Sequence, residues 1–380
     1  MKFLSLFPVR LLLLAVLAVA VHPQPSYAQD STTTTQLPKR LVGDYGYWSK
    51  FANPSYSAAQ IPFERLTHIN HDGVSFNADG TLSVPDGFIE PELTNLAHAK
   101  GVKVLLLIGG DFPGVEANGT IQTLVENLKN FAKNHDYDGF DIDWEYPATT
   151  ADRRLLVDLM SRLRYANPNY VLSVDVAPWG GYGYDLIDLP KWVDYLNIMM
   201  YDCAGPWTAH GQLNSPIFWD WHDPAPYECQ PGGSAQGAAE IFLKKVPPLQ
   251  LNMGTPFYGY FYTNINKLFG LCPNSLYNLE QDCNDYVLTE NYAPYIKDRV
   301  NKGGWQTYYD PIALVPYMLR SGENGFITYD DPVSTYLRVA YSDWMLGLGG
   351  TFMWSLDADY DGHSQDLLDA MYRATMNQGQ

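Results

Sequence analysis

The chain has 380 residues, and its 42 acidic side chains against 24 basic ones give a formal net charge of −18 at pH 7. Such a negative surface repels nucleic acid and anionic lipid, so we expect neither a nucleic-acid partner nor membrane attachment. Aromatic residues make up 14% of the sequence, with 28 Tyr and 10 Trp. This content suits either a core filled with bulky rings or a groove whose rings pack against a ligand.

The first 28 residues have the pattern of a secretion signal. Lys2 and Arg10 provide positive charge, the run Leu11–Val21 is apolar, and a final Ser-Tyr-Ala supplies the small residues that a signal peptidase reads. The apolar run is too short to span a bilayer. We therefore predict a signal peptide over residues 1–28, a disordered lead-in over 29–39, and a secreted, extracellular protein.

Eight short runs typical of β-strands occur along the chain, separated by stretches in which apolar residues recur at helical spacing. The helical pattern is clearest from Ile121 to Phe131 and from Leu155 to Leu163. Strands that alternate with helices indicate parallel pairing, and eight of them predict a closed (β/α)8 TIM barrel over residues 40–380. The predicted strands are Leu41–Tyr45, Leu66–His71, Val102–Ile108, Gly139–Asp143, Val171–Val176, Tyr195–Tyr201, Leu249–Phe257 and Gly350–Leu356.

Two connections are too long for simple turns, namely residues 203–233 after the sixth strand and 258–325 after the seventh. Both leave the carboxyl ends of strands, the rim at which barrel enzymes build their active sites. Long loops that are ordered usually carry function. A pair of cysteines in each connection argues for order, so we expect both connections to contribute to a site.

The four cysteines are Cys203, Cys229, Cys272 and Cys283. An even number of cysteines in a secreted chain favours disulfides, and four cysteines allow three pairings. We prefer the local pairing, Cys203–Cys229 and Cys272–Cys283, which closes two short loops. A zinc site is disfavoured because no pair has C-x-x-C spacing and no nearby histidine completes a ligand pattern.

The segment 139–145 places an acidic residue at every second position. In an extended strand Asp141, Asp143 and Glu145 share one face, and large apolar side chains share the other. Repulsion and partial burial raise the proton affinity of such carboxyls, as a proton donor near neutral pH requires. The interleaved apolar residues disfavour a solvated acidic turn. A Ca²⁺ or Mg²⁺ site is a competing interpretation, although such sites usually use flexible loops rather than a stiff strand.

The sequence DGFDIDWE over Asp138–Glu145 resembles the D-G-x-D-x-D-x-E signature of family 18 glycoside hydrolases, the chitinases. Further matches follow in family order and cover almost the whole chain after the predicted signal peptide. They are Gly43–Trp48 with G-x-Y-x-x-W, Met199–Asp202 with M-x-Y-D, Gly254–Gly259 with G-x-P-F-Y-G, and Gly349–Asp357 with the last strand.

This resemblance implies hydrolysis assisted by the substrate, in which the 2-acetamido oxygen of a sugar attacks its own anomeric carbon and the anomeric configuration is retained. Glu145 would protonate the leaving oxygen and then act as the base toward water. Asp143 would hold the acetamido N–H and stabilise the charged oxazolinium intermediate, and Asp141 would share a proton with Asp143.

The resemblance also implies ligand contacts around these carboxyls. Tyr201 would bond the acetamido carbonyl, and Trp354 would form the floor under the distorted sugar, although either ring could instead belong to the core. Trp207, in the first long connection, is a candidate platform for another sugar. The remaining predicted substrate-binding residues are Tyr45, Met199, Asp202 and Tyr258.

Three departures from the family pattern stand out. Leu107 occupies the position of a frequent Ser whose hydroxyl supports the carboxylates, so we expect Asp141 to be held differently. Tyr260 replaces a frequent Arg, which puts one polar contact with substrate in doubt. The insertion after the seventh strand is predicted to be reduced to residues 261–290, which would leave a shallow groove suited to endo-type cleavage.

Together these patterns predict a secreted, monomeric, endo-acting chitinase that hydrolyses β-1,4-linked N-acetylglucosamine in chitin or chitooligosaccharides, with neither a metal nor another cofactor. Two alternatives stay open. An endo-β-N-acetylglucosaminidase acting on N-glycans would use the same carboxyls in a differently shaped groove. A non-catalytic chitin-binding lectin would keep the fold, although such proteins usually lack the terminal Glu that is present here as Glu145.

Overall fold

The computed structural model describes residues 39–377, with gaps at 181–182, 224–231, 273–282 and 284–285. The predicted signal peptide and all but the last residue of the predicted lead-in therefore lie outside the described residues. Within the described part of the chain, no helix has both the length and the hydropathy needed to cross a membrane.

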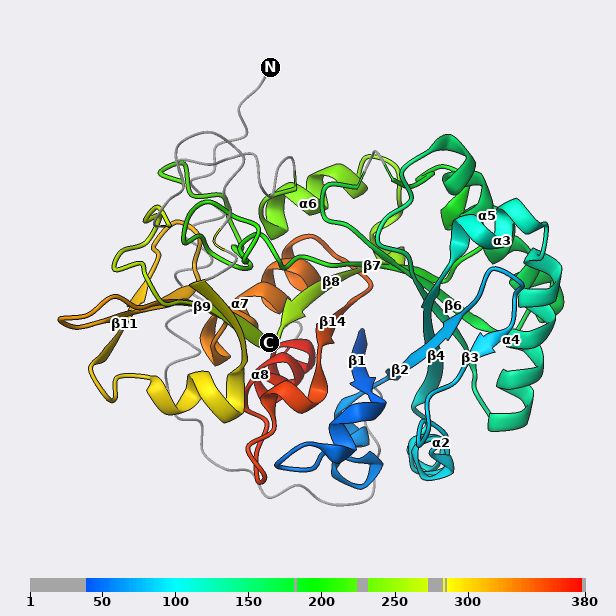
Figure 1. Ribbon diagram of the computed structural model, residues 1–380, viewed down its shortest axis with the longest axis horizontal. Helices are drawn as coiled ribbons and strands as arrows, with labels where there is room; N and C mark the ends of the chain where they lie inside the picture. The colour runs from blue at the N-terminus through cyan, green and yellow to red at the C-terminus, as the bar shows by residue number, and fades with distance from the viewer. Residues whose placement is uncertain (1–38, 181–182, 224–231, 273–282, 284–285, 378–380) are drawn as a thin grey trace.

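Eight parallel strands close into a barrel (Figure 1). Neighbours follow in the order β1-β14-β8-β7-β6-β5-β4-β2, and β1 pairs with both β14 and β2, which leaves no open edge. The predicted (β/α)8 fold is confirmed, and each predicted strand has a counterpart. The barrel strands are β1 (Arg40–Gly46), β2 (His68–Phe76), β4 (Lys103–Gly110), β5 (Gly139–Asp143), β6 (Val171–Val176), β7 (Tyr195–Ile198), β8 (Leu251–Pro256) and β14 (Gly350–Trp354).

Helices surround the barrel strands (Figure 1). In α4 the buried residues include Leu124, Val125 and Leu128, the apolar stripe that the helical spacing predicted. The α-helices are α2 (Pro91–Ala99), α3 (Phe112–Asn118), α4 (Ile121–His135), α5 (Thr150–Ala166), α6 (Ala235–Phe242), α7 (Pro332–Val339) and α8 (Asp366–Met376). Shorter helical turns are η1 (Tyr47–Phe51), η2 (Ala58–Gln60), η3 (Phe63–Arg65), η4 (Leu189–Lys191), η5 (Pro248–Gln250), η7 (Tyr292–Ile296), η8 (Lys297–Arg299), η9 (Ala340–Met345) and η10 (Leu356–Asp359).

A five-stranded antiparallel sheet follows β8 and lies beside the barrel (Figure 1). The predicted insertion of residues 261–290 is therefore too short, because the sheet extends to Thr328. Its later strands are short and are stabilised by pairing with distant segments, such as β13 with β9, which no local pattern reveals. The strands of this insertion are β9 (Tyr258–Tyr262), β10 (Val287–Asn291), β11 (Trp305–Tyr309), β12 (Pro316–Arg320) and β13 (Phe326–Thr328), while the small β3 (Leu82–Ser83) pairs with β2.

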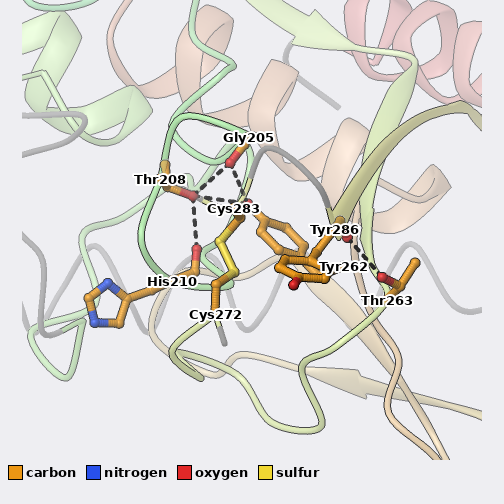
Figure 2. Close-up of a disulfide and its surroundings, with 8 residues drawn as sticks. All are labelled: Gly205, Thr208, His210, Tyr262, Thr263, Cys272, Cys283 and Tyr286. Atoms are coloured by element: carbon orange, nitrogen blue, oxygen red, sulfur yellow. Dashed lines mark hydrogen bonds between the residues drawn. A yellow bond between two sulfur atoms is a disulfide. The ribbon is translucent and has the colours of Figure 1, made fainter. Parts of the chain in front are cut away.

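A disulfide within the insertion lies against the long connection after β7, and backbone hydrogen bonds join the two segments. The predicted Cys272–Cys283 bond is confirmed, with its Cα atoms 5.6 Å apart. Next to it the Cys283 N–H donates to the carbonyl of Thr208 at 3.0 Å, and the Thr208 hydroxyl donates in turn to the carbonyl of Gly205 at 2.8 Å (Figure 2). The other predicted bond, Cys203–Cys229, involves a cysteine at position 229 that lies outside the described residues.

Candidate active site

The predicted acidic face of β5 runs from the barrel interior to its rim. Asp141 is wholly buried, Asp143 is half-buried, and Glu145, which follows the strand, is exposed. The interleaved Ile142 and Trp144 belong to the hydrophobic core. The alternation expected for an extended strand is therefore present, and it delivers three carboxyls to three depths of the same face.

Amide side chains from other barrel strands hold Asp141. Its Oδ2 accepts hydrogen bonds from Asn70 Nδ2 at 2.5 Å and from Asn197 Nδ2 at 3.1 Å, and Asn70 also donates to Asp44 at 2.9 Å. Leu107 lies in register beside Asp141 on β4 and offers no polar group. Asp141 is thus held by amides from β2 and β7, where the family pattern led us to look for a hydroxyl on β4.

Asp44 on β1 and Asp175 on β6 complete this buried group and were not predicted as site residues. Burial raises the pKa of each well above its usual range, and the charge of Asp141 raises it further. A single aspartate inside an apolar strand is the signal that marks both, because a buried carboxyl needs a partner. Their partners become visible only when the barrel closes.

Burial is also the largest influence on the pKa of Asp141, Asp143 and Glu145, the three carboxyls that we call the acidic ladder. It raises the pKa of Asp143 to about 8, with further contributions from Glu145, Asp141 and Asp72. It raises the pKa of Asp141 only to about 6, because hydrogen bonds from its neighbours stabilise the ionised form. The pKa of Glu145 is raised first by partial burial of its carboxyl and then by the negative charge of Asp202. Asp141 and Asp143 can therefore exchange protons near neutral pH.

Tyr201 and Asp202 follow β7 and lie beside the rim carboxyls. The ring of Tyr201 is buried with its centroid 6.1 Å from that of Tyr258, and burial raises its pKa, so it stays a phenol that can donate a hydrogen bond. Asp202 Oδ1 accepts hydrogen bonds from the hydroxyls of Tyr258 and, at 2.7 Å, of Tyr260. Tyr260, which stands where the family often has Arg, therefore acts on Asp202 as a neutral donor.

A cavity of about 220 Å³ lies at this rim. Three predicted substrate-binding residues, Asp202, Tyr258 and Trp354, line it. Thr289 and Asn291 on β10 line it as well, so the insertion forms one wall. These two residues were not predicted, because β10 reaches the rim only through its pairing with β9. The rest of the lining is Tyr260, Ser355 and Ala358.

Met199 and Trp207 differ in their exposure. Met199 is buried in the cluster that also contains Tyr201 and Tyr258, so it supports the site from below. The side chain of Trp207 is 48% exposed, and its ring packs edge-on against Tyr260 with the centroids 5.8 Å apart. Trp207 precedes Thr208, the residue that hydrogen-bonds beside the disulfide in Figure 2, so its backbone is tied to the insertion.

The structure does not bring Tyr45 to this site, and its predicted role in substrate binding is wrong. The side chain is wholly buried, its hydroxyl donates to Glu90 at 2.9 Å, and its ring stacks on His71 with centroids 5.3 Å apart. Strand alternation is the reason. Asp44 faces the barrel interior, where it bonds Asn70, so the next residue faces the layer outside the barrel.

Metal binding was the competing interpretation of the acidic ladder. Among the residues that the structure describes, no group of three or more His, Cys, Asp or Glu side chains is arranged to hold a metal ion. The carboxyls of the ladder instead have amide donors and a phenol from other strands beside them, an arrangement suited to acid–base chemistry.

A closed barrel with graded carboxyls at the carboxyl ends of its strands has the architecture of a barrel hydrolase. The sequence model described as glycosyl hydrolases family 18 matches residues 40–359. Because this match covers most of the chain, the protein belongs to glycosyl hydrolase family 18, and the family predicted from the sequence is confirmed.

Individual relatives are distant in sequence. Chitinase A1 of Niallia circulans is 25% identical over 94% of this chain and 61% of its own length, so this chain spans less than two thirds of that relative. Chitinase 1 of Aphanocladium album is 25% identical over 85% of this chain and 82% of its own. The crystal structure of Ostrinia furnacalis Group IV chitinase in complex with allosamidin shares the fold, with a TM-score of 0.76 and 23% identity over 89% of this chain and 99% of that chain.

Proposed function

We infer that this protein is a secreted, monomeric chitinase that hydrolyses β-1,4-linked N-acetylglucosamine polymers with retention of configuration. One observation carries the proposal, namely that Asp141, Asp143 and Glu145 lie at three depths on one face of β5, from the barrel interior to the rim beside Tyr201. The names of the relatives support chitin as the substrate class. The signal pattern over residues 1–28 supports secretion.

Glu145 is the proposed acid. It stands at the exposed end of the ladder, and its raised pKa increases the fraction that carries a proton near neutral pH. Glu145 gives this proton to the glycosidic oxygen as the bond to the anomeric carbon breaks. The resulting carboxylate then takes a proton from the attacking water, so one residue serves both steps.

Asp143 and Asp141 stabilise the positive charge of the intermediate. The 2-acetamido oxygen attacks the anomeric carbon and forms an oxazolinium ion, whose positive charge needs a nearby carboxylate. Asp143 passes its proton to Asp141, which the amides of Asn70 and Asn197 already hold, and then accepts the acetamido N–H. Because the two carboxyls form a coupled pair, one shared proton suffices for both states.

The other rim residues position the sugar. Tyr201 donates its phenol hydrogen to the acetamido carbonyl, and the ring of Trp354 packs under the apolar face of the sugar. Asp202 and Tyr258 line the same cavity, and Trp207 offers a second ring further out. Because the insertion is a full five-stranded sheet, its size no longer favours endo-type cleavage. The product pattern from long oligosaccharides decides between cleavage within the chain and at its ends.

The first test is hydrolysis of chitin oligosaccharides by the purified protein and by Glu145→Gln. We expect the wild type to release shorter oligosaccharides and the variant to lose about 10²- to 10⁴-fold in kcat while it still binds substrate. Glu116→Gln, at an exposed position on α3, is the matched control and should keep wild-type activity. Full activity in Glu145→Gln would contradict the proposed acid.

The same experiment separates the alternatives. A high-mannose glycopeptide that is cleaved while chitin oligosaccharides are not would identify an endo-β-N-acetylglucosaminidase. Oligosaccharide binding by the wild type without turnover of either substrate would identify a lectin. Both outcomes leave the family assignment intact and replace the proposed activity.

A further inference from the structure

Asp175 on β6 is a buried carboxyl that the mechanism above does not use. It is 4% exposed, and its register partners are Asp143 on β5 and Asn197 on β7. Register partners on neighbouring parallel strands point to the same face of the sheet. Asp175 therefore faces the barrel interior together with the carboxyl of Asp141 and the amide of Asn197.

Asp175 and Asp141 face the barrel interior from neighbouring strands, and each has one carboxyl oxygen, Oδ1, that is buried without a hydrogen-bond partner among the described residues. Two ionised carboxylates have no hydrogen to share, so one of the two residues carries a proton. Asp141 already accepts hydrogen bonds from the amides of Asn70 and Asn197, which favours its negative charge. Burial and the neighbouring carboxylates of Asp141 and Asp143 disfavour a second negative charge on Asp175. The proton is therefore assigned to Asp175.

The position of Asp175 compensates for the departure at Leu107. Asp141 on β5 lies between β4 and β6, and its register partners are Leu107 on the first side and Ser173 on the second. Leu107 offers no donor from β4. Asp175 lies two residues beyond Ser173 on β6 and approaches Asp141 from the opposite side of the strand.

We propose that Asp175 is a positioning residue for the hydrolysis, which keeps its proton and donates it in a hydrogen bond to Asp141. The proposal rests on the proposed function. The bond orients the Asp141 carboxylate and keeps it ready to receive the proton of Asp143 when the acetamido group binds. A neutral Asp175 does this without adding a negative charge to the buried group, and no covalent bond at Asp175 is made or broken.

The surroundings of Asp175 favour retention of this proton. Burial raises the pKa of Asp175 well above its usual range, and the neighbouring carboxylates raise it further. Asp175 consequently stays protonated while the coupled pair on β5 exchanges its proton. The titratable groups that face it are Asp141 and Asp143 on β5, Asp44 on β1, Tyr201 after β7, and Tyr184 in the connection between β6 and β7.

The test compares Asp175→Asn with Asp175→Ala in kcat against pH on chitin oligosaccharides. Asn is neutral and keeps an N–H donor, so we expect kcat within about threefold of the wild type and an unchanged profile. Ala removes the donor, so we expect kcat to fall about tenfold or more. The acidic limb of the pH profile of the Ala variant should move to higher pH, because Asp141 ionises less readily without the donor. Thr351→Ala, another truncation of a buried polar residue on a barrel strand, controls for packing damage and should leave the profile in place.

Two kinetic outcomes would overturn the proposal. An acidic limb that moves to lower pH in Asp175→Asn would mean that the native residue is ionised. A normal rate and profile in Asp175→Ala would mean that the donor has no role. If the Ala variant does not fold, the Asn variant alone still decides.

Infrared difference spectroscopy gives a readout that does not depend on activity. At neutral pH we expect the wild type to have one protonated-carboxyl C=O band that Asp175→Asn lacks. A difference spectrum without this band would overturn the proposal. A wild type that cleaves no acetamido sugar would defeat the proposed function. The infrared result would still decide where the proton lies.

Discussion

Asp138 and Asp143, two aspartates of the same signature, have opposite surroundings. Asp138 precedes β5 and contacts Lys103 and His98, each at 2.7 Å, and it accepts the N–H of Val104 at 2.9 Å. Burial would raise the pKa of Asp138, but these hydrogen bonds together lower it. Asp143 lies among other carboxyls, and burial raises its pKa to about 8.

The difference shows how one residue type serves two purposes five positions apart. A carboxylate given a cation and backbone donors stays charged and stabilises the strand, as Asp138 does at the bottom of the barrel. A carboxyl such as Asp143, which is buried among like charges, holds a proton that it can transfer. The position along the strand therefore matters less than the charge of the partners.

The largest expected effect comes from Asp143→Asn. We expect kcat on chitin oligosaccharides to fall about 10²-fold or more, because an amide cannot become the carboxylate that stabilises the oxazolinium ion. The matched variant is Asp138→Asn, which should keep its kcat but lose melting temperature, because the contacts with Lys103 and His98 are weakened. Steady-state kinetics and thermal unfolding on both variants check this, and a near-normal rate in Asp143→Asn would break the comparison.

An intermediate effect is expected from Asp202→Asn, because Asp202 is a carboxylate held by neutral phenols. Its negative charge helps to raise the pKa of Glu145, so its removal lowers that pKa. The acid then loses its proton at lower pH, and the alkaline limb of kcat/KM should move to lower pH. Asp79→Asn, at an exposed aspartate between β2 and β3, should leave the limb in place. A limb that stays fixed or moves to higher pH in Asp202→Asn would contradict this coupling.

The smallest effect is expected from Lys103→Met, which removes the cation that pairs with Asp138. Lys103 is largely exposed, so the loss in unfolding free energy should be about 0.2–1 kcal/mol at neutral pH. The folded-state pKa of Asp138 is lowered, so its pairing contributes above the unfolded pKa and is lost as the pH falls through the folded value. Denaturant unfolding should therefore show that the difference in unfolding free energy between variant and wild type becomes smaller in acid. A difference that grows in acid, or a large loss of kcat, would be the contrary result.

The barrel and the acidic ladder could be predicted because their signals are local. Alternation of carboxyls with Ile142 and Trp144 marks one strand by itself, and each barrel strand carries its own apolar run. The prediction for Tyr45 was wrong for the same physical reason that places the three carboxyls of the ladder on one face. Neighbouring residues face opposite sides of a strand, and on β1 it is Asp44 that faces the interior.

The remaining site residues depend on contacts between distant segments. Asn70 and Asn197 lie on separate strands, and only barrel closure brings both amides to Asp141. Thr289 and Asn291 reach the cavity through the antiparallel sheet of the insertion, whose short strands carry little local signal. Pairing between strands, rather than the pattern within one strand, selects these residues.

The central claim, that the acetamido group of the substrate is the nucleophile, is tested most directly with partially deacetylated chitosan. Mass spectrometry identifies the sugar at each newly formed reducing end, and NMR on fresh digests identifies its anomer. We predict that every new reducing end is an N-acetylated sugar that appears first as the β-anomer. New reducing ends that carry a free amino group, or that appear first as the α-anomer, would contradict the mechanism.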